Sequence, residues 1–152
     1  MATEFTAVAE QIVSANNNIL FTDDVIPCRK GYVHHRSGSG LISLEGLTNQ
    51  CRARYVVTYS GNIGAAPTTE GGVAGEVAVA LSINGEPILS SLRRYTAVAV
   101  ETYGAVSATE IIDVPRGTEV TIAVKNVSEG TTAAAPSAIQ TENFSIAIER
   151  IA

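Results

Sequence analysis

The sequence contains no tryptophan, few other aromatic residues and few charged ones. Aromatic residues make up 5% of its 152 positions, and charged residues make up 16%, below the roughly one quarter usual in soluble domains. The net charge of −5 comes with no basic stripe, so we expect no nucleic-acid binding. Instead, 45% of the chain is hydrophobic. Its apolar residues are mostly valine, alanine and isoleucine, a composition that favours thin pleated sheets over helices.

Long apolar runs are absent as well. No segment approaches the roughly 18 consecutive apolar residues that a membrane-spanning helix needs, so we expect no membrane association. The first residues, MATEFTAVAEQIV, are acidic where a secretory signal is basic, and no apolar core region follows them. We therefore expect synthesis and folding in a cytoplasm. Two cysteines are too few for a disulfide scaffold, and the length fits one domain.

Hydrophobic residues alternate with a period of two along most of the chain. The runs CRARYVVTY, EVAVALSI, TEVTIAVKN and NFSIAIERIA all show this pattern. Such alternation is typical of antiparallel strands with one face on a core. The residues that we expect to face inward are Cys51, Ala53, Tyr55, Val57, Tyr59, Val77, Val79, Leu81, Ile83, Val120, Ile122, Val124, Phe144, Ile146 and Ile148.

Turn signals separate these runs. The Asn84-Gly85 pair predicts a tight hairpin, and Pro115 with Gly117 predicts a second turn. The small-residue stretches 61–75 and 128–138 are interpreted as long loops, and segment 3–15 as a strand. The pattern predicts an all-β fold, a two-sheet antiparallel β-sandwich or jelly roll with about ten short strands.

The stretch IPCRKGYVHHRSGSG is the most chemically loaded part of the chain. Cys28 lies six residues before His34, and Cys51 lies sixteen after His35, and neither interval is a usual zinc-ligand spacing. GYVHHRSG also fits a short strand, which points the two histidines to opposite faces. We therefore expect no metal, no cofactor, partly exposed histidines and a buried Cys51. A Cys28–Cys51 disulfide and two free thiols both stay open.

No catalytic constellation is present in the sequence. There is no G-x-S-x-G nucleophile elbow, so we expect no catalytic residues and no enzymatic activity. Asp23 and Asp24 lack calcium-loop spacing and are interpreted as turn caps, while Glu110 and Asp113 are interpreted as a solvated edge.

Arginines form the densest positive features, and they occur as two pairs. These pairs are Arg52 with Arg54, and Arg93 with Arg94. On a strand, such pairs either form a solvated face or bind acidic residues of a neighbouring subunit. Both interpretations stay open.

Six segments follow one another along the chain: NNNILFTDDVIP, HHRSGSGLISLEG, CRARYVVTYSGNI, VALSINGEPI, DVPRGTEVTIAVKNVS and NFSIAIERIA. Their order and spacing resemble the C1q/TNF-like jelly-roll domains of bacteria and their phages. The resemblance extends from about Val8 to Ile151. It implies a ten-strand jelly roll that assembles as a homotrimer around a three-fold axis.

Members of the family that this chain resembles include spore-surface proteins with collagen-like stalks and small virion proteins of phages. This chain has no G-X-Y repeat. We therefore expect a non-enzymatic virion structural protein, a homotrimeric capsid decoration or head-fibre protein that binds and stabilises the capsid surface. Its expected partners are copies of itself and the major capsid protein or another virion protein.

Two alternatives to that function stay open. One is a ligand-binding or adhesive module that holds a glycan or a host-surface protein with loops 61–75 and 128–138, although neither loop offers an aromatic platform. The other is a bacterial spore-surface protein.

For the main hypothesis, residues 1–6 are expected to form an N-terminal arm that tethers the protein to the shell. Residues 7–152 form the single jelly-roll domain. Tyr55, Tyr59 and Phe144 are assigned to the core, with the three-fold axis as the alternative. Some apolar residues lie on the outward faces of the predicted strands, as expected if other subunits contact both sheets. These residues are Val56, Ala78, Ala80 and Ala147.

Overall fold

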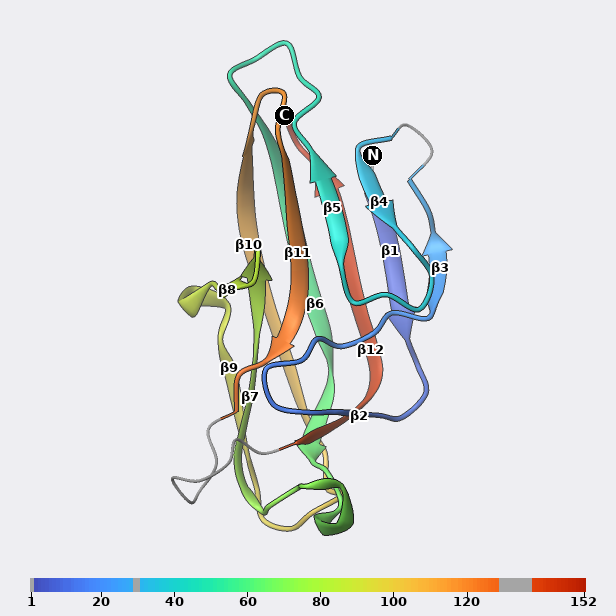
Figure 1. The fold of residues 1–152 in the computed structure, drawn as a ribbon, viewed down its shortest axis with the longest axis vertical. Coiled ribbons are helices and arrows are strands. Elements are labelled where there is room, and N and C mark those ends of the chain that lie inside the picture. The colour runs from blue at the N-terminus through green and yellow to red at the C-terminus, as the bar shows by residue number, and fades with distance from the viewer. Residues whose placement is uncertain (1, 29–30, 129–137) are drawn as a thin grey trace.

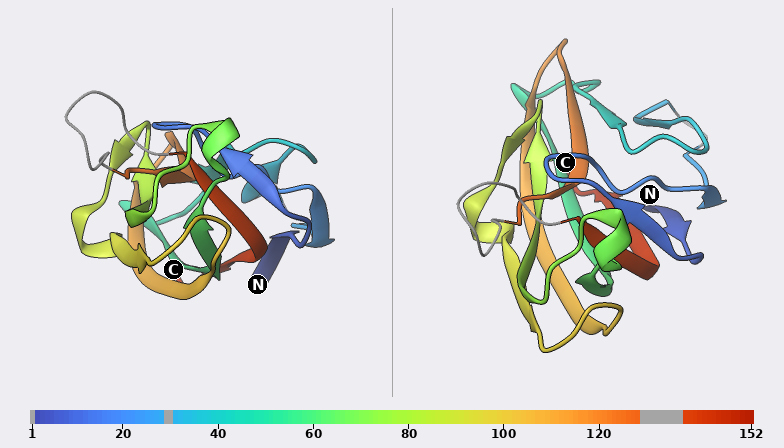
Figure 2. Two further views of the ribbon diagram at one scale, coloured as in Figure 1. Left: turned by 90° about the horizontal axis from the view of Figure 1, so that it is seen from below. Right: turned by 60° about the horizontal axis from the view of Figure 1, so that its bottom comes forward.

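The computed structural model describes residues 2–28, 31–128 and 138–152. Their strands form two six-stranded antiparallel sheets that pack face to face (Figures 1 and 2). Short 3₁₀ turns are the only helical elements among these residues, η1 (Thr68–Glu70) and η2 (Leu89–Ser91). The predicted fold class, a two-sheet antiparallel sandwich of the jelly-roll type, is confirmed.

Sheet A has the strand order β10-β6-β12-β1-β3, and β2 also pairs with β12. Its strands are β1 (Ala2–Ala7), β2 (Gln11–Val13), β3 (Asp23–Ile26), β6 (Arg52–Ala65), β10 (Gly104–Pro115) and β12 (Ile139–Arg150). The three longest strands of the molecule, β6, β10 and β12, lie side by side in this sheet (Figure 1).

Sheet B has the strand order β4-β5-β11-β7-β8, and β9 also pairs with β7. Its strands are β4 (Val33–His35), β5 (Ile42–Glu45), β7 (Gly75–Ile83), β8 (Glu86–Pro87), β9 (Arg93–Ala97) and β11 (Glu119–Asn126). The described residues thus contain twelve strands where the sequence predicted about ten. Strands of two or three residues, such as β8 and β4, are too short to show an alternating pattern.

The core between the sheets contains the aromatic side chains that the sequence assigned to it. Tyr55, Tyr59 and Phe144 are at most 1% exposed, and the rings of Tyr59 and Phe144 stack with centroids 5.9 Å apart. Each buried tyrosine hydroxyl finds a carbonyl of the other layer. Tyr59 donates to the Ser91 carbonyl at 2.5 Å, and Tyr55 donates to the Glu45 carbonyl at 2.6 Å. These bonds satisfy the polar ends of otherwise apolar side chains.

A bulge in β12 shifts its pairing with β6 between Glu142 and Ser145, where Asn143 has a φ of 48°. The next residue, Phe144, turns inward over Gly61 of β6. A Cβ atom built on Gly61 would lie 2.2 Å from the Phe144 ring. Gly61 is therefore required by close packing, because any side chain there would displace the ring.

Both predicted turns are present. Asn84 and Gly85 have φ values of 51° and 88° and connect β7 to β8, as a two-residue hairpin requires. The turn that contains Gly117 connects β10 to β11, and this glycine has a φ of 75°.

The structure corrects the boundary between an arm and the jelly roll. Residues 1–6 were expected to form an extended tether, but residues 2–7 form β1, which pairs with β12 on one side and β3 on the other. Phe5 of this strand is 2% exposed. An apolar residue at this depth makes the segment part of the sheet and of the core, so it is not available as a free arm.

Two further predictions from the period of two are wrong. Cys51 was expected to face the core, but β6 begins one residue later, and Cys51 lies exposed in the preceding loop. The stretch 61–75 was expected to be a loop throughout, but β6 continues to Ala65. Residues 129–137, which include most of the predicted loop 128–138, lie outside the described residues.

The contact between Gly61 and Phe144 gives a test of the packing. We expect Gly61→Ala to lower the free energy of unfolding by about 1–3 kcal/mol, because overfilling a packed site forces side chains from their preferred positions. Urea unfolding of the two single variants and the double variant Gly61→Ala/Phe144→Leu forms a double-mutant cycle. The smaller leucine should recover part of the loss. Simple additivity of the two single changes would contradict the contact.

Candidate interaction surfaces

The outer face of sheet A carries a strip of uncharged side chains across its three longest strands. In the pairing register, Ser145, Ser60 and Ser107 lie in one row, and Ala147, Thr58 and Thr109 lie in the next. Val56 and Ile111 lie opposite each other in a third row. We call these eight residues the neutral strip: Val56, Thr58, Ser60, Ser107, Thr109, Ile111, Ser145 and Ala147.

Hydroxyl groups of the neutral strip hydrogen-bond to one another across the strands. Thr58 and Thr109 are 2.9 Å apart between their Oγ1 atoms, and Ser60 and Ser145 are 3.3 Å apart between their Oγ atoms. Ile111 remains 63% exposed in the same strip. Four of the five hydroxyls on this small-residue surface are already paired, which lowers the cost of dehydrating it. Depletion of charged residues is also typical of the centres of interfaces.

Charged side chains border one end of the neutral strip and pair within the chain. Arg54 donates from Nε to Asp113 at 2.8 Å, and Arg52 Nε lies 3.6 Å from the same carboxylate. On sheet B, Arg94 pairs with Glu76 at 2.9 Å. The two arginine pairs were left open between a solvated face and a neighbouring subunit. Arg52, Arg54 and Arg94 have acidic partners in their own chain, whereas Arg93 donates to the Ser107 carbonyl at 2.9 Å.

The outer face of sheet B offers far less open apolar surface. Ala78 and Ala80 are at most 4% exposed, and the Lys125 side chain donates from Nζ to the Gly85 carbonyl at 3.2 Å, beside β7. The aliphatic part of a lysine can cover apolar surface in this way. Of the outward apolar residues expected to meet other subunits, Val56 and Ala147 stay accessible, whereas Ala78 and Ala80 are buried by their own chain.

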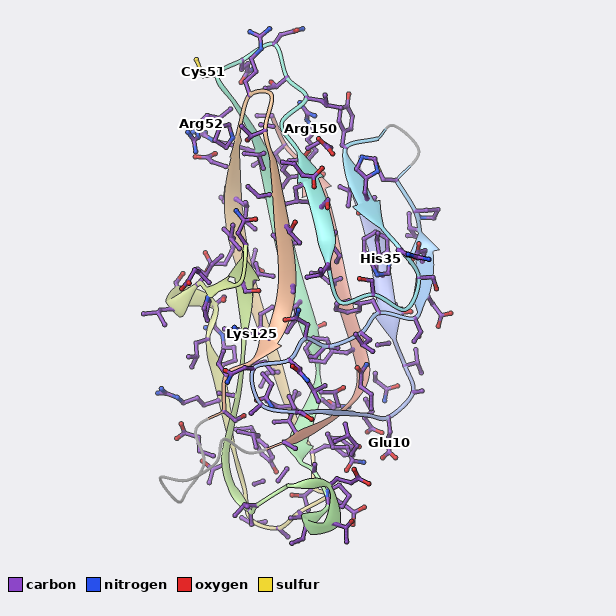
Figure 3. The ribbon with its side chains drawn as sticks, in the orientation of Figure 1. Glu10, His35, Cys51, Arg52, Lys125 and Arg150 are labelled. Carbon is purple, nitrogen blue, oxygen red and sulfur yellow. The ribbon has the colours of Figure 1, made fainter. Side chains whose placement is uncertain are left out.

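His35 connects the two sheets along one side of the sandwich. It lies on β4 of sheet B, and its Nδ1 atom is 2.6 Å from Asp24 Oδ1 on β3 of sheet A (Figure 3). Its Nε2 atom is 2.8 Å from the Ser39 carbonyl, and its ring packs 4.5 Å from that of Phe5. Both ring nitrogens thus face an oxygen atom, one of a carboxylate and one of a carbonyl.

This contact revises two expectations from the sequence. His35 was expected to be partly exposed, but its side chain is 0% exposed, while that of His34 is 56% exposed. The prediction that the two histidines point to different faces is confirmed. Asp24 was interpreted as a turn cap, but it binds His35. Eleven residues separate the two, and no local motif signals the contact.

A second titratable group lies on the outer face of sheet B. Glu45 of β5 pairs directly with Glu119 of β11, and His34 Nε2 lies 3.5 Å from Glu45 Oε1. A hydrogen bond from Glu119 raises the pKa of Glu45, with burial and the Glu119 charge adding to the rise and His34 opposing it. Glu119 opposite Glu45 therefore favours the protonated form of Glu45.

Several residues of the stretch 26–40 line one shallow hollow of about 440 Å³. Cys28, His34, His35 and Arg36 contribute to it together with Asp24. Both nitrogens of His35 are already engaged, so His35 itself offers no free base in this hollow. Cys51 is an exposed free thiol, and the Cys28–Cys51 disulfide is not formed. In the described part of the chain, no three His, Cys, Asp or Glu side chains group around a possible metal position.

Comparison with known proteins identifies the fold. The structure is similar to that of Eiger TNF from S. frugiperda, with a TM-score of 0.64, 11% identity, and coverage of 100% of this chain and 92% of that one. It is also similar to murine APRIL, with a TM-score of 0.57, 11% identity, and coverage of 98% and 99%. The chain has the C1q/TNF-like jelly-roll fold.

The globular domain of zebrafish complement 1qA protein is similar as well. Its TM-score is 0.56 at 10% identity, with coverage of 99% of this chain and 97% of that one. No protein-family model and no curated protein sequence matches the chain. Among the described residues, no helix has the length and apolar character to cross a membrane.

The His35 contact predicts different effects for two neighbouring histidines. We expect His35→Ala to lower the free energy of unfolding by about 2–4 kcal/mol, because it removes a buried ring and leaves Asp24 without its partner. The matched change His34→Ala, at an exposed position, should alter it by about 0.5 kcal/mol or less. Urea unfolding of both variants measures this, and equal effects would show that His35 does not join the sheets.

The Glu45–Glu119 pair predicts a pH dependence of stability. The raised pKa of Glu45 means that the folded state holds its proton more tightly than the unfolded state. The resulting stability is present below the ordinary pKa of Glu45 and is lost as the pH rises through the raised value. Glu119→Gln should therefore stabilise the protein at pH 7 by about 0.2–1 kcal/mol.

The control for this variant is Glu149→Gln, which removes the same charge opposite the uncharged residues Ala2 and Val56. Thermal unfolding between pH 4 and pH 8 compares the two variants with the natural chain. A stability gain at pH 7 that is equal in both would point to net charge and away from the pair.

Proposed function

We propose that this protein is a non-enzymatic structural protein that assembles as a homotrimer through the outer face of sheet A. The observation that carries the proposal is the neutral strip, eight uncharged side chains on the three longest strands, bordered by Glu149 beside Val56. The similarity of the sequence to the C1q/TNF-like family, whose domains assemble as trimers, supports a three-fold arrangement. The intrachain pairing of Arg52 and Arg54 with Asp113 supports it further, because these two arginines beside the strip already have an acidic partner in their own chain.

We further propose that the trimer decorates a phage capsid and stabilises its surface. The support is the similarity of the sequence to small virion proteins of that family and the absence of a collagen-like repeat. Because β1 is held in sheet A, the contact with the capsid has to come from the folded surface and its loops. Immunogold labelling of purified virions with antibodies against the recombinant protein tests this location. Label found only in the lysate, and none on virions, would reject it.

Solution mass is the direct test of assembly. Size exclusion with light scattering should give a mass of 3 × 15.8 = 47.4 kDa. A large positive side chain in the neutral strip should reduce this mass to that of one chain, because a desolvated, unpaired charge is costly at an interface centre. The variants are Thr109→Arg on β10 and Ala147→Arg on β12, both at exposed positions.

Thr96→Arg is the matched control. Thr96 is an exposed threonine on a strand of sheet B, and it pairs with Glu76, so an arginine there meets an opposite charge. We expect this variant to keep the mass of the natural chain. A monomeric natural chain would reject the trimer. If all three variants stay trimeric, the trimer interface does not include the neutral strip.

A further inference from the structure

Four oxygen-bearing side chains gather on the outer face of sheet A, at the end opposite Arg52 and Arg150 (Figure 3). We call them the oxygen cluster: Glu10, Tyr103, Gln140 and Glu142. Tyr103 donates its hydroxyl to Glu10 Oε1 at 2.7 Å. The Gln140 side-chain amide lies within hydrogen-bonding reach of the same hydroxyl, and the charge of Glu142 acts on it.

The pairing register explains why these side chains meet. Gln140 and Glu142 are two residues apart on β12, so they share a face, and they pair with Gly64 and Asn62 of β6. A Cβ on Gly64 would lie 1.9 Å from the Thr102 carbonyl, so the missing side chain lets the segment before β10 approach closely. Tyr103, the next residue of that segment, thereby reaches Gln140.

Glu10 approaches from the other side of β12. Gln11 pairs with Thr141, and the Asn143 N–H donates to the Val8 carbonyl at 3.1 Å. The segment between these two contacts therefore runs beside Glu142. Glu10 and Glu142 thus lie on adjacent segments of one chain.

The oxygen cluster has more acceptors than donors. Gln140 is 5% exposed, and its Oε1 atom has no hydrogen-bond partner. No ion pair within the described residues involves Glu10 or Glu142. The hydroxyl of Tyr103 donates its one hydrogen bond to Glu10 Oε1. Glu10 is exposed and Glu142 is half-buried, so water reaches both carboxylates, whereas the buried amide oxygen of Gln140 is left without a partner.

We propose that the oxygen cluster binds a divalent cation of the Ca²⁺ type through the Glu10 and Glu142 carboxylates and the Gln140 amide oxygen. A cation supplies the charge that the acceptors lack. An all-oxygen set selects a hard cation over zinc or copper. Ca²⁺ suits ligands from separate segments, because it tolerates irregular geometry and completes its shell with water, whereas Mg²⁺ demands a near-ideal octahedron.

Many metal sites contain three or more Asp, Glu, Cys or His side chains, and the described residues hold no such group. The oxygen cluster contains only two carboxylates. Gln140 is therefore the distinguishing ligand. A competing occupant is a lysine or arginine of another copy of this chain, which would satisfy the same carboxylates without metal. The experiment has to separate these two.

The probes are CaCl₂ and Tb³⁺ in chelator-treated protein. Because the chain has no tryptophan, Tb³⁺ emission excited near 280 nm reports transfer from tyrosine, and Tyr103 belongs to the cluster. We expect saturable Tb³⁺ emission that CaCl₂ displaces, and calorimetric Ca²⁺ binding with one site per chain. Glu142→Gln and Gln140→Met should each weaken Ca²⁺ binding by about tenfold or more.

Glu149→Gln removes the same charge from the other end of β12 and should leave Ca²⁺ binding unchanged. Absence of saturable CaCl₂ binding to the natural chain would overturn the proposal, as would equal weakening by Glu142→Gln and Glu149→Gln. If a basic residue of another copy fills the cluster, Ca²⁺ will bind only to the monomer, which also rejects the site as proposed.

Light scattering of the same samples, with CaCl₂ and with EGTA, keeps this test separate from the proposed assembly. All ligands come from one chain, so a monomeric protein that binds Ca²⁺ would reject the trimer and retain the cation site. A trimer that binds no Ca²⁺ would retain the proposed assembly and reject the cation site.

Discussion

The bulge in β12 is the constraint on which most of sheet A depends. Phe144, Ile146 and Ile148 face the core at even-numbered positions, and so do Ile139 and Thr141 at odd-numbered positions on the other side of the bulge. Without the extra residue at the bulge, the period of two would turn Gln140 and Glu142 into the apolar interior. The bulge keeps one face of a twelve-residue strand buried and sends Glu142 and Glu149 to the other face. Arg150, at the end of the strand, lies on the inward side over the Tyr32 ring. It also places the neutral strip and the oxygen cluster on the same side of the sheet.

Polar contacts then fix how the two sheets lie against each other. The hydroxyl groups of Tyr55 and Tyr59 donate to carbonyls outside their own sheet, and the His35–Asp24 contact joins sheet B to sheet A along the edge formed by β4 and β3. Apolar packing alone allows two sheets to slide, because it has no direction. Hydrogen bonds between the layers are directional, so they select one arrangement.

The period of two was sufficient to predict the class of fold, the main strands and their inward faces. It failed where a residue has a role that neighbours in the sequence do not reveal. Cys51 continues the alternating pattern but lies just outside β6, since a pattern does not mark where a strand ends. Gly61 and Gly64 resemble loop residues, yet each is a strand residue that permits close approach. The contact of His35 with Asp24 and the gathering of the oxygen cluster depend on register and on the bulge, which no short motif encodes.

The pairing of Ala2 with Glu149 brings the beginning of the first strand beside the end of the last, at the end of the molecule away from Glu10 (Figure 3). A linker of a few residues would close this chain into a ring without disturbing a strand. A protein fused to either end would project from the same side, leaving the opposite end of the sandwich open to solvent. The fold thus has a built-in direction, with one end suited to attachment and the other to presentation.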